Sequence, residues 1–87
     1  MKLLFCKSCE DLVRLHSYKR SCKCGKCWGY YKDRTQAIYS KEAIPIGLLN
    51  SEFVAAVTNR NSRKDGLGVR FTAFSIPENS PSIERDK

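Results

Sequence analysis

The residues with the most informative chemistry are five cysteines in the first third of the chain. They are Cys6, Cys9, Cys22, Cys24 and Cys27, so that a first pair is followed, after a twelve-residue insert, by a group of three. Zinc binds four thiolates in a tetrahedron at about 2.3 Å. Two close groups of cysteines separated by a hairpin-length insert are typical of a zinc ribbon. We therefore expect a structural Zn²⁺ bound by four of the five.

The spacing leaves open which cysteines complete the site. Cys6 and Cys9 belong to either arrangement. Two-residue spacers are common at zinc, which favours Cys24 with Cys27. The alternative is Cys22 with Cys24, which places Gly25 directly after the last ligand, as zinc knuckles often do. A disulfide framework is not expected, because the first residues do not predict an export signal and an odd number of cysteines leaves one thiol unpaired.

Aromatic and basic residues follow the second cysteine group and form a first candidate ligand surface. Trp28, Tyr30 and Tyr31 stand among lysines that include Lys23 and Lys26. Interleaved aromatic rings and cations stack on bases and neutralise phosphates, although aromatic residues also build the core of a small domain. Strand alternation places Tyr30 and Tyr31 on opposite faces, so at most one of the two is expected in the core.

The loop at residues 59–68 is a second candidate anion site. Its cations Arg60, Arg63 and Lys64, together with Arg70, are candidates for holding a phosphate. The loop follows the expected end of a helix, where the dipole disfavours anions and where cations also cap the last carbonyl groups.

The charge distribution favours anionic partners. The chain has 87 residues and a formal net charge of +7, and residues 1–34 hold nine Lys or Arg against three Asp or Glu. Four thiolates on one divalent zinc would lower the net charge to about +5. A basic domain of this kind suits nucleic acid, a nucleotide or an acidic protein surface. Catalysis is not expected, because we find no catalytic constellation around the single His16, which is expected in a polar turn.

The length leaves room for one domain. We expect an α+β fold in which a small zinc-ribbon-like β-hairpin unit (residues 1–34) precedes a strand, one short helix and a final strand (residues 35–76). Residues 77–87, with two prolines and five charges, are expected to form a mobile tail. No apolar run is long enough to span a membrane, so we expect a soluble, cytoplasmic protein.

The expected elements follow from local patterns. Residues 12–15 and 18–22 are expected to pair as the zinc-ribbon hairpin, and residues 36–40 to form a strand. Residues 43–47 are assigned to an extended loop because of Pro45. Asn50 is the expected cap of a helix of about ten residues. Residues 69–76, rich in β-branched and aromatic side chains, are expected to form the last strand.

A series of short motifs along almost the whole chain resembles a group of small bacterial and phage proteins for which no activity is established. The motifs are Cys22-Lys23-Cys24-Gly25-Lys26, Ala43-Ile44-Pro45-Ile46-Gly47 and Phe71-Thr72-Ala73-Phe74 with Ile76-Pro77, and the second is the most distinctive. The group typically has Ser or Thr at the position of Cys27. The resemblance therefore implies that the ligands are Cys6, Cys9, Cys22 and Cys24. It also suggests a phage origin and, with it, a bacterial host cell as the location.

These features lead to three functional hypotheses. The first is a non-enzymatic, zinc-stabilised protein that binds an anionic nucleotide-type ligand, with nucleic acid favoured. The second is a homo-oligomer that sequesters a host nucleotide immune signal and so acts against host defence. The third is an inhibitor that docks on a host protein.

Overall fold

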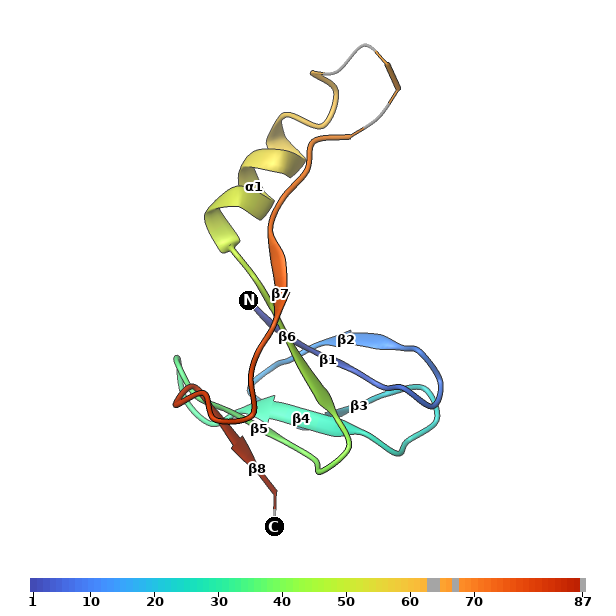
Figure 1. Cartoon of the computed structure of the whole chain (residues 1–87), viewed down its shortest axis with the longest axis vertical. Helices are drawn as coiled ribbons and strands as arrows, with labels where there is room; N and C mark the ends of the chain where they lie inside the picture. Colours follow the sequence, from blue (N-terminus) through green and yellow to red (C-terminus); the bar gives the residue numbers. More distant parts are fainter. Residues whose placement is uncertain (63–64, 67, 87) are drawn as a thin grey trace.

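In the computed structural model, which describes residues 1–62, 65, 66 and 68–86, the chain folds into two small β-sheets and one short helix (Figure 1). The elements over these residues are β1 (Lys2–Phe5), β2 (Leu12–Arg14), β3 (Arg20–Ser21), β4 (Trp28–Tyr31), β5 (Ala37–Tyr39), β6 (Ile44–Leu48), α1 (Asn50–Thr58), β7 (Ala73–Ser75) and β8 (Ile83–Arg85). The expected α+β class is confirmed. None of the described helices is long and apolar enough to cross a membrane.

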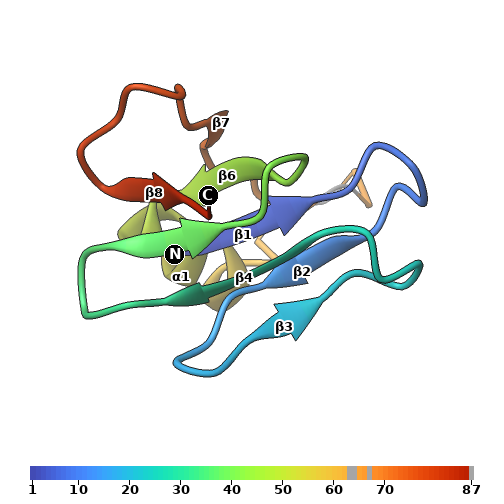
Figure 2. The ribbon, with the colours of Figure 1, turned by 90° about the horizontal axis from the view of Figure 1, so that it is seen from below.

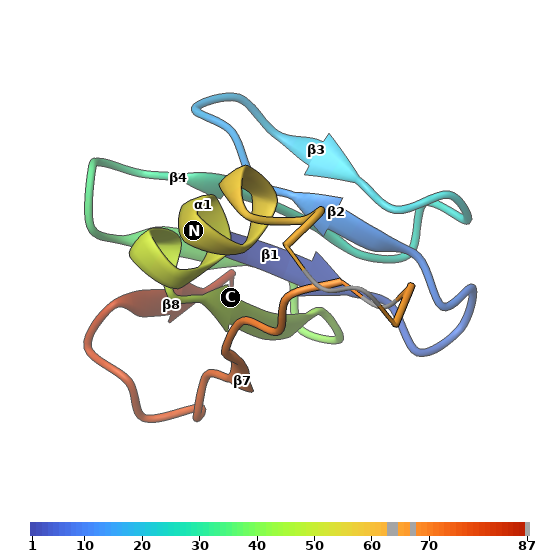
Figure 3. The same cartoon turned by 90° about the horizontal axis from the view of Figure 1, so that it is seen from above.

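The two sheets form two layers. Sheet I has the strand order β2-β1-β6-β7, and sheet II has the order β3-β4-β5-β8. All neighbouring strands are antiparallel except β5 and β8, which run parallel. Seen from below, sheet II lies in front of sheet I (Figure 2). Seen from above, α1 lies in front, so the helix stands on the side of sheet I that is turned away from sheet II (Figure 3).

The core lies between the two sheets. Leu4 of β1, Leu15 and Tyr39 of β5 are almost completely buried. Gly29 of β4 lies directly against this core, because a Cβ atom there would meet Leu15 Cδ2 at 3.1 Å. The buried Tyr39 hydroxyl donates a hydrogen bond to the carbonyl oxygen of Leu3 at 2.9 Å, which ties sheet II to sheet I.

The pairing of residues 12–15 with residues 18–22 was predicted wrongly. β2 pairs with β1, and β3 pairs with β4, so the two strands of the insert lie in different sheets. The reason is that each cysteine loop closes its own hairpin: the segments on either side of residues 6–11 pair, as do those on either side of residues 22–27. The insert between the loops is a connection from one sheet to the other.

Residues 43–47 lie mostly in a strand rather than in a loop. β6 runs from Ile44 to Leu48 between β1 and β7. Pro45 is tolerated because its carbonyl oxygen accepts the N–H of Ile76, just beyond the last residue of β7. The backbone nitrogen and carbonyl of one strand residue point to the same neighbour, so the missing N–H of Pro45 faces the end of that pairing.

The helix and the last expected strand differ from expectation in their bounds. Leu49, not Asn50, is the residue that precedes α1, and it makes no side-chain capping bond. Asn50 is the first helical residue, and its Oδ1 accepts a hydrogen bond from the N-terminal amine of Met1. Of residues 69–76, only Ala73–Ser75 form β7, and the carbonyl of Thr72, one residue earlier, accepts the N–H of Leu49 just before the helix.

The expected tail contains an element of the fold. Ile83–Arg85 form β8, which extends sheet II beside β5. Ile83 is buried, and Arg85 donates to the carbonyl oxygens of Ser40 and Ala43 and pairs with Glu78. The many charges of residues 77–87 suggested full solvation, but an apolar anchor and this arginine attach the segment to the sheet.

Candidate metal centre

Two loops of equal length bring the cysteines into position. In the first loop the N–H of Cys6 donates to the carbonyl of Asp11 at 3.0 Å, and in the second the N–H of Cys22 donates to the carbonyl of Cys27 at 2.9 Å. Each loop turns through a residue of positive φ: Glu10 at 57° and Gly25 at 81°. Glycine adopts this conformation at no steric cost, which explains its place in the second loop.

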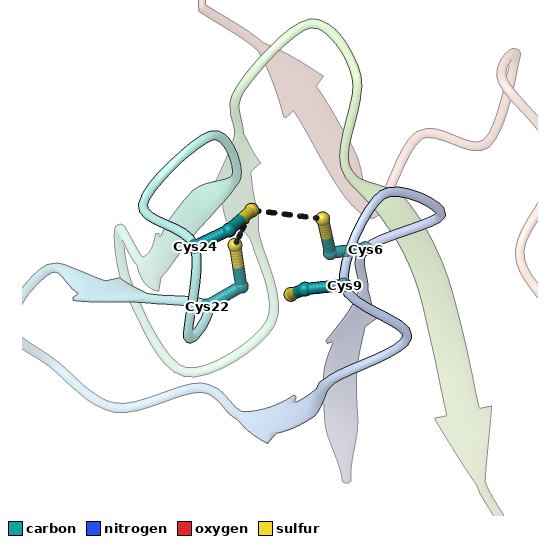
Figure 4. Close-up of side chains that lie close together, drawn as sticks. All are labelled: Cys6, Cys9, Cys22 and Cys24. Carbon is teal, nitrogen blue, oxygen red and sulfur yellow. Dashed lines mark hydrogen bonds between the residues drawn. The ribbon is translucent and has the colours of Figure 1, made fainter.

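The sulfur atoms of four cysteines converge in the space between these loops (Figure 4). They belong to Cys6, Cys9, Cys22 and Cys24, and all lie within 4.8 Å of one another. The Sγ of Cys24 is 3.5 Å from that of Cys22 and 3.7 Å from that of Cys6. A tetrahedron with metal–sulfur bonds of about 2.3 Å has edges of about 3.8 Å. The donor set therefore fits one tetrahedral metal ion.

The electrostatics of the cluster favour ionisation at Cys22 and Cys6 and oppose it at Cys24. Burial opposes ionisation of Cys22, but the N–H of Cys27 and the neighbouring thiols of Cys24, Cys6 and Cys9 outweigh it and lower the pKa of Cys22 to about 6. The backbone N–H of Cys9 lowers the pKa of Cys6. Although the N–H of Lys26 favours the thiolate of Cys24, burial and the adjacent thiols raise its pKa to about 11. Cys22 is thus the thiolate that is ready for a metal at neutral pH.

Cys27 lies next to the cluster but outside it. Its side chain is 1% exposed and belongs to the core. Burial, with the adjacent sulfur atoms, raises the pKa of Cys27 to about 12. Its backbone N–H donates to Cys22 Sγ at 3.3 Å. The residue therefore contributes to the metal centre through its backbone, while its thiol fills the core.

The lysines of the second loop lie beside the cluster on the surface. Lys23 and Lys26 are exposed. The N–H of Lys23 donates to the Asp11 carboxylate at 2.9 Å, so the two cysteine loops are also joined to each other directly. The loop continues into β4 one residue after Cys27.

The aromatic residues of β4 divide between its two faces, as alternation predicted. Trp28 and Tyr30 lie on the outer face, with nearly parallel rings whose centroids are 6.2 Å apart. The ammonium of Lys19 lies over the Trp28 ring, 4.2 Å from its centroid. Tyr31 faces the core, where its hydroxyl accepts the N–H of Lys2 at 2.8 Å.

An open cavity of about 610 Å³ adjoins this aromatic pair. It is lined by Lys26, Trp28, Ser40, Lys41, Glu42 and Asp86. Lys19 and Lys41 were absent from the sequence-based candidates. Strand alternation in the sequence could have indicated that Trp28 and Tyr30 share one face of β4. Nothing in the sequence indicates Lys41, which comes close to Trp28 only because β4 pairs with β5.

The described residues of the second candidate anion site, Arg60 and Arg70, do not line the cavity beside Trp28. Arg60 lies just beyond α1 and donates to the carbonyl of Val57 at 2.8 Å, the capping role considered as the alternative. Arg70 is exposed and lies a few residues before β7. Arg63 and Lys64 lie outside the described residues. His16 stacks on Tyr18 in the turn between β2 and β3, with ring centroids 4.6 Å apart.

The chain was also compared with known proteins. No protein-family model, no curated protein and no solved structure matches it.

Proposed function

We propose that this chain is a non-enzymatic, zinc-stabilised protein that binds single-stranded nucleic acid on the outer face of sheet II. The observation that carries the proposal is the parallel pair of rings, Trp28 and Tyr30, which share the outer face of β4. Both rings are half-buried, so they are held in place and still partly exposed. Aromatic side chains held in this way are the usual stacking platform for unpaired bases, and each stacked base contributes about 1–3 kcal/mol.

Cations surround the platform on one side. Lys19 lies over Trp28, and Lys26 and Lys41 line the cavity beside it. Lys23 lies in the same cysteine loop as Lys26. These four side chains supply positive charge for a phosphate backbone while the rings hold its bases.

Acidic residues limit the platform on the opposite side. Lys32, which alternation places on the same face as Tyr30, is paired with Glu84 of β8 at 3.3 Å. Glu42 and Asp86 line the same cavity as Lys26 and Lys41, so the positive charge toward the cysteine loops comes mainly from Lys19 and Lys23. We infer that the strand runs over Trp28 toward Lys19 and Lys23.

Zinc is the proposed occupant of the four-cysteine site. A closed set of four thiolates leaves no open position for a substrate, and zinc is the ordinary metal of such structural sites. The ion would add folding free energy by joining the two loops. Since the second loop carries Lys23 and Lys26 and leads directly into Trp28, the site would also hold the cations beside the platform.

A free nucleotide is a second candidate ligand, favoured by the cavity of about 610 Å³ beside Trp28. Its volume is in the range of small-molecule sites. Lys26 and Lys41 would face the phosphates and the Trp28 ring would face the base. A mononucleotide competing with a single strand for this surface would support this candidate.

The proposal is tested by fluorescence anisotropy with a labelled oligothymidine of about 12 nucleotides, long enough for one small domain. We expect Trp28→Ala and Tyr30→Ala each to weaken binding by about tenfold or more, because each removes a stacking partner. Tyr18→Ala is the matched control, because Tyr18 is 60% exposed and stacks on His16 rather than on Trp28 or Tyr30.

Salt dependence gives a second measure of the same binding. If four lysines contact phosphates of a single strand, a plot of the logarithm of the binding constant against the logarithm of the salt concentration should have a slope of about −3. Retained metal in each variant shows that the fold is intact. An absence of binding at about 50 mM salt contradicts the proposal, as does an equal loss of binding in the Tyr18 control.

A further inference from the structure

The face of sheet I turned away from sheet II is apolar. Leu4 of β1 faces the core beside Gly29, so alternation turns Leu3 and Phe5 to the other face. The register places Ile46 beside Leu3, and places Leu12 and Ile44 beside Phe5. The outer face of sheet I thus carries Leu3, Phe5, Leu12, Ile44, Ile46 and Leu48.

This pattern is typical of a sheet that is covered on both sides. An antiparallel sheet with one solvated face normally alternates apolar and polar residues. β1 and β6 instead read as nearly continuous apolar runs, as strands buried on both faces do. Leu12, at the edge of this face, is 53% exposed. Leu3 is already buried and Phe5, Ile44 and Ile46 are half-buried in the single chain, so the uncovered part of this apolar face lies at its edge, around Leu12.

A second uncovered apolar element stands on the same side of sheet I. We call it the arm: α1 together with residues 69–75, which run beside it (Figures 1 and 3). Within α1, whose nine residues are all described, only Ala56 is buried, while Val54 is 61% and Val57 46% exposed. A helix of this length is marginal in water unless tertiary packing supports it. The arm gains that support if another surface covers it.

The exposed area is that of a protein interface. The large apolar side chains exposed on or beside the arm and at Leu12 present roughly 400 Å² to solvent, which is in the range of the largest patch on a typical monomer. They are Leu12, Leu49, Val54, Val57 and Phe71, whereas the register places Phe74 beside Gly47, on the face toward sheet II. A standard interface buries about 800 Å² per partner, of which somewhat more than half is apolar. The exposed apolar surface is therefore close to the apolar part of one standard interface.

The distribution of charge identifies the partner as a second copy. A chain of net charge +7 repels its own kind wherever its basic face is involved. The lysines around Trp28 lie on sheet II, on the opposite side of the molecule, whereas Arg14 is the one charged residue among the described strand residues on the outer face of sheet I. The arm carries charges of both signs, Glu52 and Arg70. Two copies joined through this side keep their basic faces apart.

We propose that two copies of this chain dimerise through the outer face of sheet I and the arm. The contact packs Leu12, Phe5 and Ile44 of one copy, with Val54 and Val57 of its arm, against the same surface of the other. This inference does not depend on the proposed function, because the interface uses neither the platform nor the metal centre.

The test is sedimentation equilibrium of the metal-loaded full chain. We expect a dimer for the unmodified protein, and a dissociation constant raised about tenfold or more by Leu12→Glu and by Val54→Glu, since each places a charge in an apolar interface. Both positions are exposed in the single chain, so neither substitution should disturb its fold. Tyr18→Glu is the matched control: it changes a side chain that is 60% exposed in the turn between β2 and β3, and it should leave the dimer unchanged.

Salt provides an independent check of the same interface. Raising the salt screens the repulsion between two basic chains, so the apolar dimer should persist or tighten. A protein that stays monomeric up to hundreds of micromolar overturns the proposal. So does a dimer that Leu12→Glu and Val54→Glu leave unchanged, or one that salt dissociates.

Discussion

The backbone N–H of Cys27 donates a hydrogen bond to the Sγ of Cys22 at 3.3 Å, while the thiol of Cys27 is buried in the core. One residue thus supports a metal ligand through its backbone and fills the core with its side chain. This relationship explains how five closely spaced cysteines form a four-cysteine site. The carbonyl of Cys27 closes the second loop as that of Asp11 closes the first, so both residues hold equivalent positions in the two loops.

The first prediction separates the two kinds of cysteine. Cys27→Ala should retain one metal ion per chain and lose about 1–2 kcal/mol of unfolding free energy, because it removes a buried sulfur and keeps the N–H. Cys24→Ala should lose the metal, because it removes one of four converging ligands. Native mass spectrometry gives the metal count of both variants. Loss of the metal from Cys27→Ala with retention in Cys24→Ala would reverse the assignment.

The second prediction concerns the proton balance of metal binding. The pKa of Cys22 in the folded, metal-free chain is about 6, well below its ordinary value of 9.0. Cys22 is therefore a thiolate above pH 6 and releases no proton when a metal binds, whereas below pH 6 it releases one. The number of protons released per zinc should rise by one as the pH falls through about 6, and affinity should fall with it.

The control for this measurement is Cys27→Ala, which leaves the four ligands in place. Titration of the chain with zinc in weak buffer with a pH indicator gives the proton count. If the number of protons released per zinc stays constant between about pH 8 and about pH 5, the low pKa of Cys22 is contradicted.

The third prediction tests how the sheets are joined. Tyr39→Phe removes the hydroxyl that donates to the Leu3 carbonyl at 2.9 Å and should lower the unfolding free energy by about 1 kcal/mol. Tyr18→Phe removes an equivalent hydroxyl from an exposed ring and should change nothing measurable. Urea denaturation of the metal-loaded protein compares the two variants. Equal stability of both would show that the hydroxyl of Tyr39 does not connect the sheets.

The fourth prediction tests the packing of β4 on the core. In Gly29→Ala the new methyl group would meet Ile38 O at 3.0 Å and Leu15 Cδ2 at 3.1 Å, so the neighbours must move. We expect a loss of about 1–3 kcal/mol. Gly68→Ala is the control, because a Cβ atom there meets nothing within 4 Å. Thermal melts of both variants decide the question, and an undiminished melting temperature for Gly29→Ala would contradict the close packing of the sheets.

The sequence predicted those features that depend on local spacing. The cysteine spacing pointed to a four-sulfur site, and alternation placed Tyr30 and Tyr31 on opposite faces of β4. The choice between Cys22 and Cys27 was beyond spacing. It depends on which sulfur the loop turns inward. The local pattern gave an argument for each arrangement, and the resemblance to the small bacterial and phage proteins then favoured Cys22.

Features that depend on distant partners could not be predicted from local patterns. Pro45 is compatible with a strand because its missing N–H faces the end of β7, thirty residues away in the chain. β8 forms because Ile83 and Arg85 find β5 and the carbonyls of Ser40 and Ala43. The amino-acid composition of residues 77–87 alone had indicated a solvated tail. The same limit applies to Lys41, which joins the platform only through the sheet.

The most direct test of the proposed binding surface uses the fluorescence of Trp28, the only tryptophan in the chain. Its emission reports directly on contacts at the stacking platform, without a label. We expect a single-stranded oligonucleotide to quench it saturably, and a duplex of the same length to quench it far less, because paired bases offer no free faces for stacking. Quenching should also weaken steeply as salt rises. Emission that single strands leave unchanged at low salt would contradict the account.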